Sequence, residues 1–526
     1  MGLFGKWSRR DLLKSSGIAA GALAPIAASS TPAMAESISF TGTEKDNLFT
    51  QIGVRPILNA RGTYTILSGS RSLPQVKQAM FEASHYYVQM DEMMDGVGKE
   101  LARLNGCESA MATTGCEAAI MLATIACVAG SNVEKCQALP YIKGKDQVII
   151  PKHSRNPYDV GVRMVGAEVV EVETPAELKA KISPRTAMIY VTSDPQEAKS
   201  VLPIRTILAI AKEKNIPVFV DAAAEEPMSP NVYMQQGASF VGYSGGKCLR
   251  GPQSSGVLLG KADLIKAAWF QASPHHNYGR AVKCSKEEAM GILAAVRQWY
   301  KRDHDGEQRM WRGWMQTVET RLKPIPGLQF EYLEPQGLSN RATRLRIRWD
   351  AAQLGITGTE VEKRLNDGTP RIMVEPATGR RPDQMASSIT LMPYMMDPGE
   401  DRILADAIFK VLSNPGSNPN PVLPGGTPAS VAGDWAVTIH YSCGTGEQIF
   451  ALKQNGNALT GEHKGEIYTG MLQGSIHGDQ VKLQSNMAVP GNGIHWSFEG
   501  SVRGNAASGN VTMGEYGPAT WTAIKA

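Results

Sequence analysis

A lysine framed by glycines is the most reactive feature of this sequence. Lys247 lies in Ser244-Gly245-Gly246-Lys247, downstream of an apolar run, Ile216–Val220, that ends in Asp221. A lysine amine in such a loop can form a Schiff base with the aldehyde of pyridoxal phosphate (PLP). An aspartate at a strand end can keep the pyridine nitrogen of that cofactor protonated, so that the ring accepts electrons. Lysines beside paired glycines are also common in solvated loops, so the assignment needs further support.

A second element is suited to holding a phosphate. Thr114-Gly115-Cys116 follows a short apolar run, 109–112, and opens an Ala/Ile/Leu-rich helix. Free backbone amides and the positive end of a helix dipole bind phosphate, and the Thr114 hydroxyl adds a donor. Helices also begin at Thr-Gly simply because these residues cap them. The order along the chain of this phosphate-binding turn, Asp221 and Lys247 favours a cofactor site.

Other candidates are a ring-stacking residue and the residues that would bind substrate. His153 follows a strand, and its imidazole can stack on the cofactor ring, although an ordinary loop histidine is the alternative. Arg371, Asn59 and Gln253 are predicted to bind substrate, with the Arg371 guanidinium forking onto a carboxylate.

Alternating strands and helices must position these residues. Strands separated by helices of this length predict an α/β fold with a mostly parallel, doubly wound sheet. Ligands of such sheets bind beyond the carboxyl ends of the strands, where Thr114, His153, Asp221 and Ser244 are expected. The predicted strands are Gln147–Pro151, Glu168–Val172, Ala187–Val191, Ile216–Val220 and Phe240–Tyr243, and the helices between them are Asn156–Val165, Ala176–Ile182 and Ile204–Lys214.

Composition divides the chain into six segments. Residues 413–432 form a linker rich in Pro and Gly, and beyond it short alternating segments with tight-turn signals predict a small antiparallel β-barrel or sandwich. That last domain has no nucleophile–base pair, which favours a structural or binding role, and its Trp435, Trp496 and Trp521 are expected mainly in its core. The predicted segments are a signal peptide (1–35), an N-terminal arm (36–74), a large PLP-binding domain (75–310), a smaller α+β domain (311–412), the linker (413–432) and the β domain (433–526).

The N-terminus has the pattern of an export signal. Ser8-Arg9-Arg10-Asp11 precedes a mildly apolar run and Ala33-Met34-Ala35, which together resemble a twin-arginine leader cleaved after Ala35. A periplasmic or secreted location is therefore expected. Because this route carries folded proteins, a cofactor can be inserted before export.

Charge and cysteine content exclude several classes. A net charge of +4 gives no reason to expect a nucleic-acid partner, and no apolar run is long enough to span a membrane as a helix. Seven cysteines do not make a disulfide framework in 526 residues, although Cys127 and Cys136 are close enough to be candidates for one bridge. No His/Cys cluster suggests a metal site.

From about Gly53 to Leu412 the sequence resembles bacterial selenocysteine synthases and glucosaminate-phosphate ammonia-lyase-like proteins, which are PLP enzymes of fold type I. The most specific segments are 54–60, Thr114-Gly115, 153–158, Val220-Asp221 and 244–256. The resemblance implies that Lys247 carries PLP, that Asp221 pairs with the pyridinium, that His153 stacks on the ring, and that Thr114, Gly115, Cys116 and Ser244 hold the phosphate. Thr192-Ser193-Asp194 departs from the pattern because it lacks the asparagine that many fold-type-I enzymes place near the cofactor hydroxyl. The last domain resembles lipocalin- or avidin-like barrels more weakly.

These observations predict a PLP-dependent lyase or transferase that acts on a small amino acid or amino sugar acid. The leading reaction is α,β-elimination with release of ammonia. Transamination, aldol cleavage, racemisation and selenium or sulfur transfer stay open, as does a non-catalytic exported binding protein on the same scaffold. Fold-type-I enzymes usually build each active site from two subunits, so a homodimer or larger assembly is expected.

Overall fold

The structure is a computed structural model that describes residues 47–141, 143–195, 197–422 and 424–526. The twin-arginine leader predicted over residues 1–35 lies outside this part of the chain, as does the beginning of the predicted arm. In the described residues, no helix is long and apolar enough to cross a membrane. All seven cysteines are described and free, so the candidate bridge between Cys127 and Cys136 is not formed.

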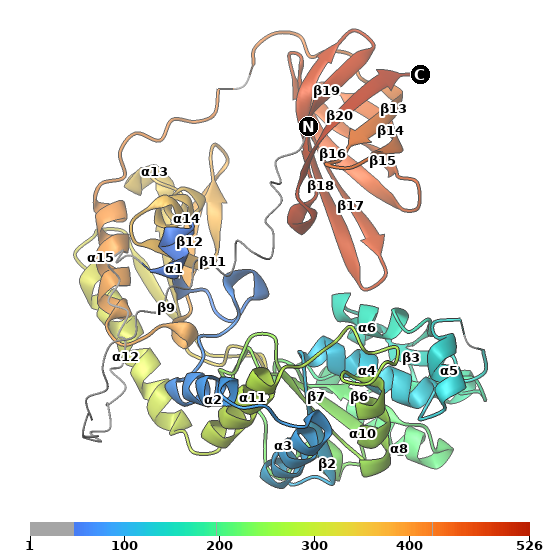
Figure 1. The fold of residues 1–526 in the computed structure, drawn as a ribbon. Coiled ribbons are helices and arrows are strands. Elements are labelled where there is room, and N and C mark those ends of the chain that lie inside the picture. The colour runs from blue at the N-terminus through green and yellow to red at the C-terminus, as the bar shows by residue number, and fades with distance from the viewer. Residues whose placement is uncertain (1–46, 142, 196, 423) are drawn as a thin grey trace, which may run out of the picture. The chain divides into compact units, whose positions relative to one another are not determined.

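A seven-stranded sheet forms the centre of the larger α/β part (Figure 1). Its order is β2-β8-β7-β6-β5-β3-β4, and all neighbours pair in parallel except β8, which runs antiparallel to both β2 and β7. The mostly parallel sheet is therefore confirmed. The strands are β2 (Ser109–Thr113), β3 (Gln147–Pro151), β4 (Glu168–Val172), β5 (Thr186–Thr192), β6 (Val218–Asp221), β7 (Phe240–Ser244) and β8 (Gly256–Gly260).

Helices pack around this sheet. The Ala/Ile/Leu-rich helix α4 lies against β5 to β8 and is buried along nearly its whole length, which explains its uniformly apolar sequence. The helices of this part are α2 (Pro74–Ser84), α3 (Met90–Asn105), α4 (Cys116–Val128), α5 (Val133–Ala138), α6 (Val160–Arg163), α7 (Pro175–Lys181), α8 (Ile204–Lys214), α9 (Val232–Gln235), α10 (Ala262–Gln271) and α11 (Lys286–Trp299).

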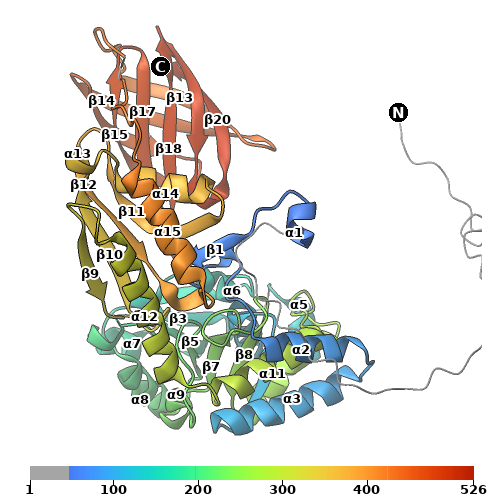
Figure 2. The same cartoon turned by 90° about the vertical axis from the view of Figure 1, so that its left-hand side faces the viewer.

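A five-stranded sheet, in the order β1-β11-β12-β10-β9, forms the smaller α+β part. Helices α12 (His304–Leu322) and α15 (Glu400–Ser413) lie side by side against it (Figure 2). Its edge strand β1 (Ile57–Ala60) was expected in an extended arm but instead pairs in parallel with β11. The remaining elements are β9 (Gln329–Leu333), β10 (Arg344–Asp350), β11 (Arg371–Arg380), β12 (Gln384–Leu391), α13 (Ala351–Leu354) and α14 (Gly358–Asp367), and α1 (Leu48–Gln51) precedes β1.

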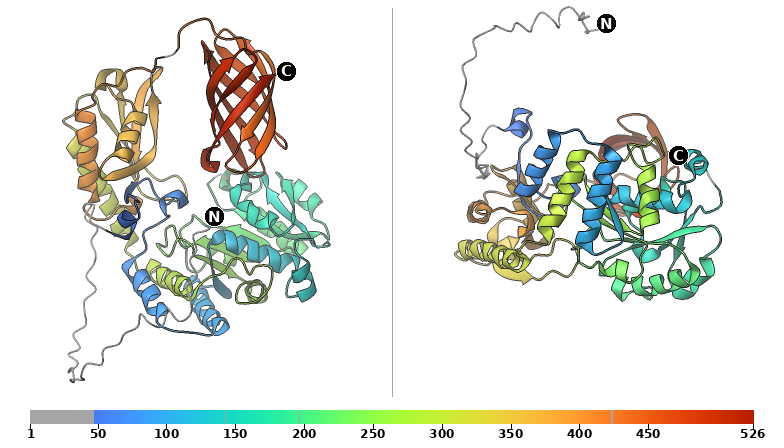
Figure 3. Two further views of the ribbon diagram at one scale, coloured as in Figure 1. Left: turned by 45° about the horizontal axis from the view of Figure 1, so that its top comes forward. Right: turned by 60° about the horizontal axis from the view of Figure 1, so that its bottom comes forward.

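The last eight strands close into an antiparallel barrel, as the sequence predicted (Figure 3, left). Every strand pairs with its successor, and β13 pairs with β20 to complete the ring. Trp435, Trp496 and Trp521 are buried inside it, which confirms them as core residues. The strands are β13 (Gly433–His440), β14 (Thr445–Asn455), β15 (Ala458–Lys464), β16 (Thr469–His477), β17 (Gln480–Val489), β18 (Asn492–Arg503), β19 (Ala506–Thr512) and β20 (Pro518–Lys525).

A buried histidine makes the barrel sensitive to acid. His463 is 0% exposed among aromatic rings, its Nε2 lies 2.6 Å from Gln448 Oε1, and its Nδ1 has no protein partner. Burial lowers the pKa of His463 from 6.5 to about 4. Because the unfolded chain binds this proton more readily, stability is complete above pH 6.5 and is lost as pH falls toward 4.

We therefore expect the barrel to lose on the order of 3 kcal/mol of unfolding free energy between pH 7 and 4 through this residue. Hydrogen exchange of the β15 amides in the full-length protein measures that loss. A His463→Gln variant, which can still bond Gln448 but does not titrate, should lack this component. Equal pH dependence in both proteins would refute the prediction.

Candidate active site

The predicted site residues meet at one edge of the seven-stranded sheet. Asp221 ends β6, Ser244 ends β7, and in the parallel registers Thr192 pairs with Asp221, which in turn pairs with Gly242. Thr114 follows β2 and His153 follows β3, whose carboxyl ends point the same way. The sheet therefore brings together the strand-end residues as the sequence predicted.

Asp221 is held by three donors. Its carboxylate is buried, with Oδ2 accepting from the Tyr190 hydroxyl at 2.6 Å and Oδ1 accepting from the Ala223 amide at 3.0 Å. The Cys116 thiol lies 3.6 Å from Oδ1. Burial, followed by the Asp221 charge, raises the pKa of Cys116 well above its usual value, so this thiol stays protonated. The result is a fixed carboxylate beneath the start of α4.

The first turn of α4 fits a phosphate. Gly115 at the helix start has φ +96°, no side chain caps the helix, and a Cβ on Gly115 would meet nothing within 4 Å. The space beside Gly115 is thus open at the positive end of the helix dipole, where backbone amides bind anions. Thr114 Oγ1 donates to Ser254 O at 3.1 Å, which joins this turn to the segment 244–256 that contains Lys247.

The lysine loop, residues 244–256, folds back on itself and needs its glycines. A Cβ on Gly245 would lie 2.0 Å from Ser255 Oγ, and one on Gly246 would lie 2.8 Å from Gln253 Cα. Within the part of the chain that the structure describes, the Lys247 ammonium has no hydrogen-bond or ion-pair partner. Its positive charge lowers the pKa of the Cys116 thiol, against the effect of burial, so Lys247 lies near this cluster. A lysine without a salt bridge, beside a buried aspartate and an uncapped helix start, fits covalent attachment of PLP.

Sequence reasoning missed a group of polar residues beside Asp221. Asn156 Nδ2 donates to Thr192 Oγ1 at 2.9 Å and lies 3.1 Å from the Tyr190 hydroxyl. An asparagine from the segment after β3 therefore reaches the end of β5, where the local sequence has none. Tyr158 also belongs here, because burial and then the Asp221 charge raise the pKa of its phenol. The segment 153–158 was the signal, although only His153 was chosen from it.

His153 itself is tied to the protein by both ring nitrogens. Nδ1 lies 3.1 Å from Ser154 Oγ, and Nε2 lies 3.2 Å from Leu202 O. These contacts fix the imidazole at the strand edge and anchor the loop that follows β5. Its stacking on a cofactor ring stays a prediction.

The three predicted substrate residues lie in two places. Asn59 Oδ1 accepts from the amides of Arg61 and Gly62 and so fixes the turn after β1. Gln253 Nε2 donates to Thr65 O at 3.1 Å, which joins the segment after β1 to the lysine loop. Arg371 begins β11, and its Nε donates to Asn366 Oδ1 at 2.8 Å. Their roles stay predictions.

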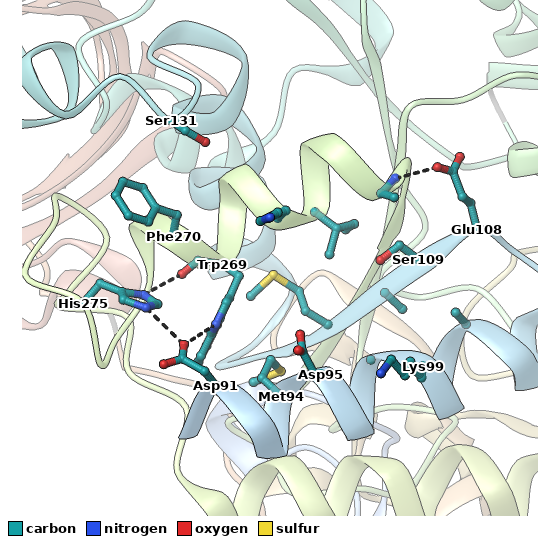
Figure 4. A pocket seen from close by; sticks show the side chains of 17 residues that line it. Asp91, Met94, Asp95, Lys99, Glu108, Ser109, Ser131, Trp269, Phe270 and His275 are labelled. Atoms are coloured by element: carbon teal, nitrogen blue, oxygen red, sulfur yellow. Dashed lines mark hydrogen bonds and ion pairs between the residues drawn. The ribbon is translucent and has the colours of Figure 1, made fainter. Parts of the chain in front are cut away.

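A cavity of about 710 Å³ lies elsewhere, between α3 and α10 (Figure 4). At one end, Trp269 Nε1 donates to Asp91 Oδ1 at 2.8 Å and His275 Nε2 lies 3.1 Å from the same oxygen. None of the predicted site residues lines it, so this cavity is separate from the cluster around Asp221.

The sheet order, the two-part α/β architecture and the strand-end cluster define the class as a fold-type-I PLP-dependent enzyme. Residues 41–286 match the family described as Cys/Met metabolism PLP-dependent enzyme. The chain is 30% identical over 337 residues to 5'-C-glycyluridine monooxygenase-decarboxylase of Streptomyces sp, spanning 62% of this chain and 83% of that protein. The chain belongs to this family of PLP-dependent enzymes, and the prediction of PLP as cofactor is confirmed.

Two further comparisons concern one activity. D-glucosaminate-6-phosphate ammonia lyase of Salmonella typhimurium (strain 14028s / SGSC 2262) is 28% identical over 333 residues, which is 61% of this chain and 87% of the relative. A solved structure of D-glucosaminate-6-phosphate ammonia-lyase superposes with a TM-score of 0.62 at 25% identity, covering 70% of this chain and 98% of that one. The similarity to ammonia lyases therefore extends through nearly the whole of those proteins.

Proposed function

We propose that this enzyme is a lyase that releases ammonia from a small amino acid or amino sugar acid by α,β-elimination. The observation that carries the proposal is the placement of Lys247, Asp221 and the uncapped start of α4 at one sheet edge. The similarity to the Salmonella ammonia lyase supports this reaction. The Streptomyces relative is named for a different one, so the reaction needs a direct test.

The residues have separate roles in this proposal. Bound PLP supplies an electron sink for the bond that breaks at Cα. Asp221, fixed by the Tyr190 hydroxyl, would keep a proton on the pyridine nitrogen, and the α4 amides with Gly115, Cys116, Thr114 and Ser244 would hold the phosphate. Lys247 would attach the cofactor and would move the proton at Cα, and His153 would stack on the ring.

The test is a panel of amino acids and amino sugar acids incubated with the full-length holoenzyme. The proposal expects one equivalent of ammonia for each equivalent of keto acid, without a keto-acid co-substrate and without oxygen consumption. Keto acid formed only with an amino acceptor would indicate transamination, and oxygen uptake with carbon dioxide release would indicate oxidative decarboxylation. No product from any amino compound would favour a binding protein.

We also propose a homodimer or larger assembly. Large apolar side chains from the N-terminal part of the chain are exposed, among them Leu48 at 78%, Ile66 at 84% and Tyr87 at 103%. Such a concentration of exposed apolar surface is typical of an interface. Light scattering after size exclusion tests this, and a monomer that keeps full cofactor content and turnover at low concentration would contradict it.

Export by the twin-arginine route is a further part of the proposal. It rests on Arg9, Arg10 and the Ala33-Met34-Ala35 cleavage pattern. Fractionation of cells that produce the full chain, compared with a variant in which both arginines are lysine, tests it. Retention of only the variant in the cytoplasm supports export.

A further inference from the structure

One arginine differs from the rest in how its charge is satisfied. Arg61 is partly buried, its Nε is buried without a partner, and its guanidinium has no hydrogen bond or ion pair among the described residues. The Arg61 Cζ lies 4.9 Å from the centroid of the Tyr64 ring. The other described arginines without a partner are all exposed, namely Arg205, Arg380, Arg402 and Arg503. A partly buried guanidinium without a hydrogen-bond acceptor destabilises the fold unless a bound anion accepts its hydrogen bonds.

The turn that carries Arg61 is rigidly held. Asn59 Oδ1 accepts from the Arg61 and Gly62 amides at 2.9 and 3.0 Å, and Asn59 Nδ2 donates to Gly62 O at 2.9 Å. Asn340 Oδ1 accepts from the Thr63 amide and hydroxyl at 3.0 and 2.8 Å. Gly62 has φ +114°, and a Cβ there would lie 3.0 Å from the Asn340 side chain. The backbone of this arginine is thus fixed before any ligand binds.

This turn leads directly to the lysine loop. Thr65 O accepts from Gln253, and a Cβ on Gly69 would lie 2.8 Å from Gly246 O, next to Lys247. Arg371, by contrast, lies opposite Ile57 at the far end of the β1–β11 pair. Arg61 lies four positions beyond Ile57, which is about 13 Å at the rise of an extended chain. Of these two arginines, Arg61 is at the end of β1 that continues toward the cofactor lysine.

We propose that Arg61 binds the carboxylate of the substrate, an inference that rests on the lyase function proposed above. The planar guanidinium matches a carboxylate through two parallel hydrogen bonds. Because Nε is buried, the two terminal nitrogens of Arg61 are the ones that would donate to it. The substrate class is then an amino acid or amino sugar acid with a free carboxylate, held from the β1 turn rather than from β11.

The test uses D-gluconate, a sugar acid without the amino group needed to react, and calorimetric titration of the full-length holoenzyme. Arg61→Gln is expected to weaken gluconate binding roughly 10- to 100-fold, the range for loss of a charged hydrogen-bond partner. Arg61→Lys keeps the charge without the planar guanidinium, so its affinity for gluconate should lie between those of Arg61→Gln and the unaltered protein. Arg402→Gln, which changes an exposed arginine of α15, is the matched control and should bind gluconate as the unaltered protein does. Arg371→Gln tests the alternative placement of the carboxylate at β11. Unchanged near-ultraviolet circular dichroism and cofactor absorbance show that each variant is folded.

A second titration with glucose 6-phosphate, which has a phosphate but no carboxylate, separates the two anionic groups. Weakening of gluconate alone by Arg61→Gln supports the proposal. Gluconate that fails to bind the unaltered protein, binds Arg61→Gln equally well, or depends on Arg371 would overturn it, and so would a loss confined to glucose 6-phosphate. Failure of the lyase function would instead appear as absence of ammonia release by the unaltered enzyme, which is measured separately.

Discussion

Replacing Lys247 with alanine is expected to remove the covalently bound cofactor and to lower turnover roughly 10³-fold or more, because attachment and proton transfer at Cα are lost together. The ammonium has no salt bridge in the described part of the chain, and it lies with Asp221 and Cys116 at the strand ends. The visible absorbance of purified protein measures attachment. Borohydride reduction followed by peptide mapping should place the cofactor on the peptide that contains Lys247.

Lys266→Ala is the matched control, because Lys266 lines the separate cavity between α3 and α10. This variant should keep the absorbance and the turnover. A reduced adduct on any lysine other than Lys247, or full activity of Lys247→Ala, would contradict the assignment.

Replacing Asp221 with alanine is expected to have the second-largest effect. Without the buried carboxylate nothing holds a proton on the pyridine nitrogen, so turnover should fall about 10²- to 10⁴-fold, the usual range for a positioned proton donor. The uncapped start of α4 and Lys247 are untouched, so cofactor should still attach. Absorbance and turnover measured on the same sample separate these two effects.

Tyr190→Phe provides the comparison for that variant. It removes the 2.6 Å hydrogen bond to Asp221 but keeps the carboxylate and most of the packing. The expected loss is about 10- to 100-fold, the equivalent of one hydrogen bond to a charged group of about 1.5–3 kcal/mol. If both variants lost activity equally, the Asp221 charge would not be the group that matters.

The sequence predicted the cluster at the sheet edge because strand ends follow from the alternation of strands and helices. An apolar run precedes each of the site residues Asp221, Ser244, Thr114 and His153. A parallel sheet therefore places them at the same edge, regardless of the exact strand order. Tyr190 was missed because it lies inside an apolar strand and reads as core. Its bond to Asp221 depends on the register of β5 with β6, which local sequence does not contain.

Two other differences have similar causes. The four residues of β1 are too few to show from sequence which strand β1 pairs with, so an extended arm was the simpler expectation. Arg61 is not distinguished from its neighbours by sequence, since only the structure shows that its side chain is partly buried and that its guanidinium has no hydrogen bond or ion pair among the described residues. Asn156 follows β3 and reaches Thr192 at the end of the neighbouring β5, and that proximity comes from the strand order β5-β3.

The ring of barrel strands has a consequence for synthesis. β13 needs β20 as its neighbour, although seven strands precede β20 in the barrel. During translation the barrel therefore stays an open sheet with two unpaired edges until β20 leaves the ribosome, whereas the cofactor-binding part ends its last helix earlier, at Ser413. The cofactor-binding part can thus fold before the barrel closes, and loss of β20 alone would leave β13 and β19 as edges open to other chains.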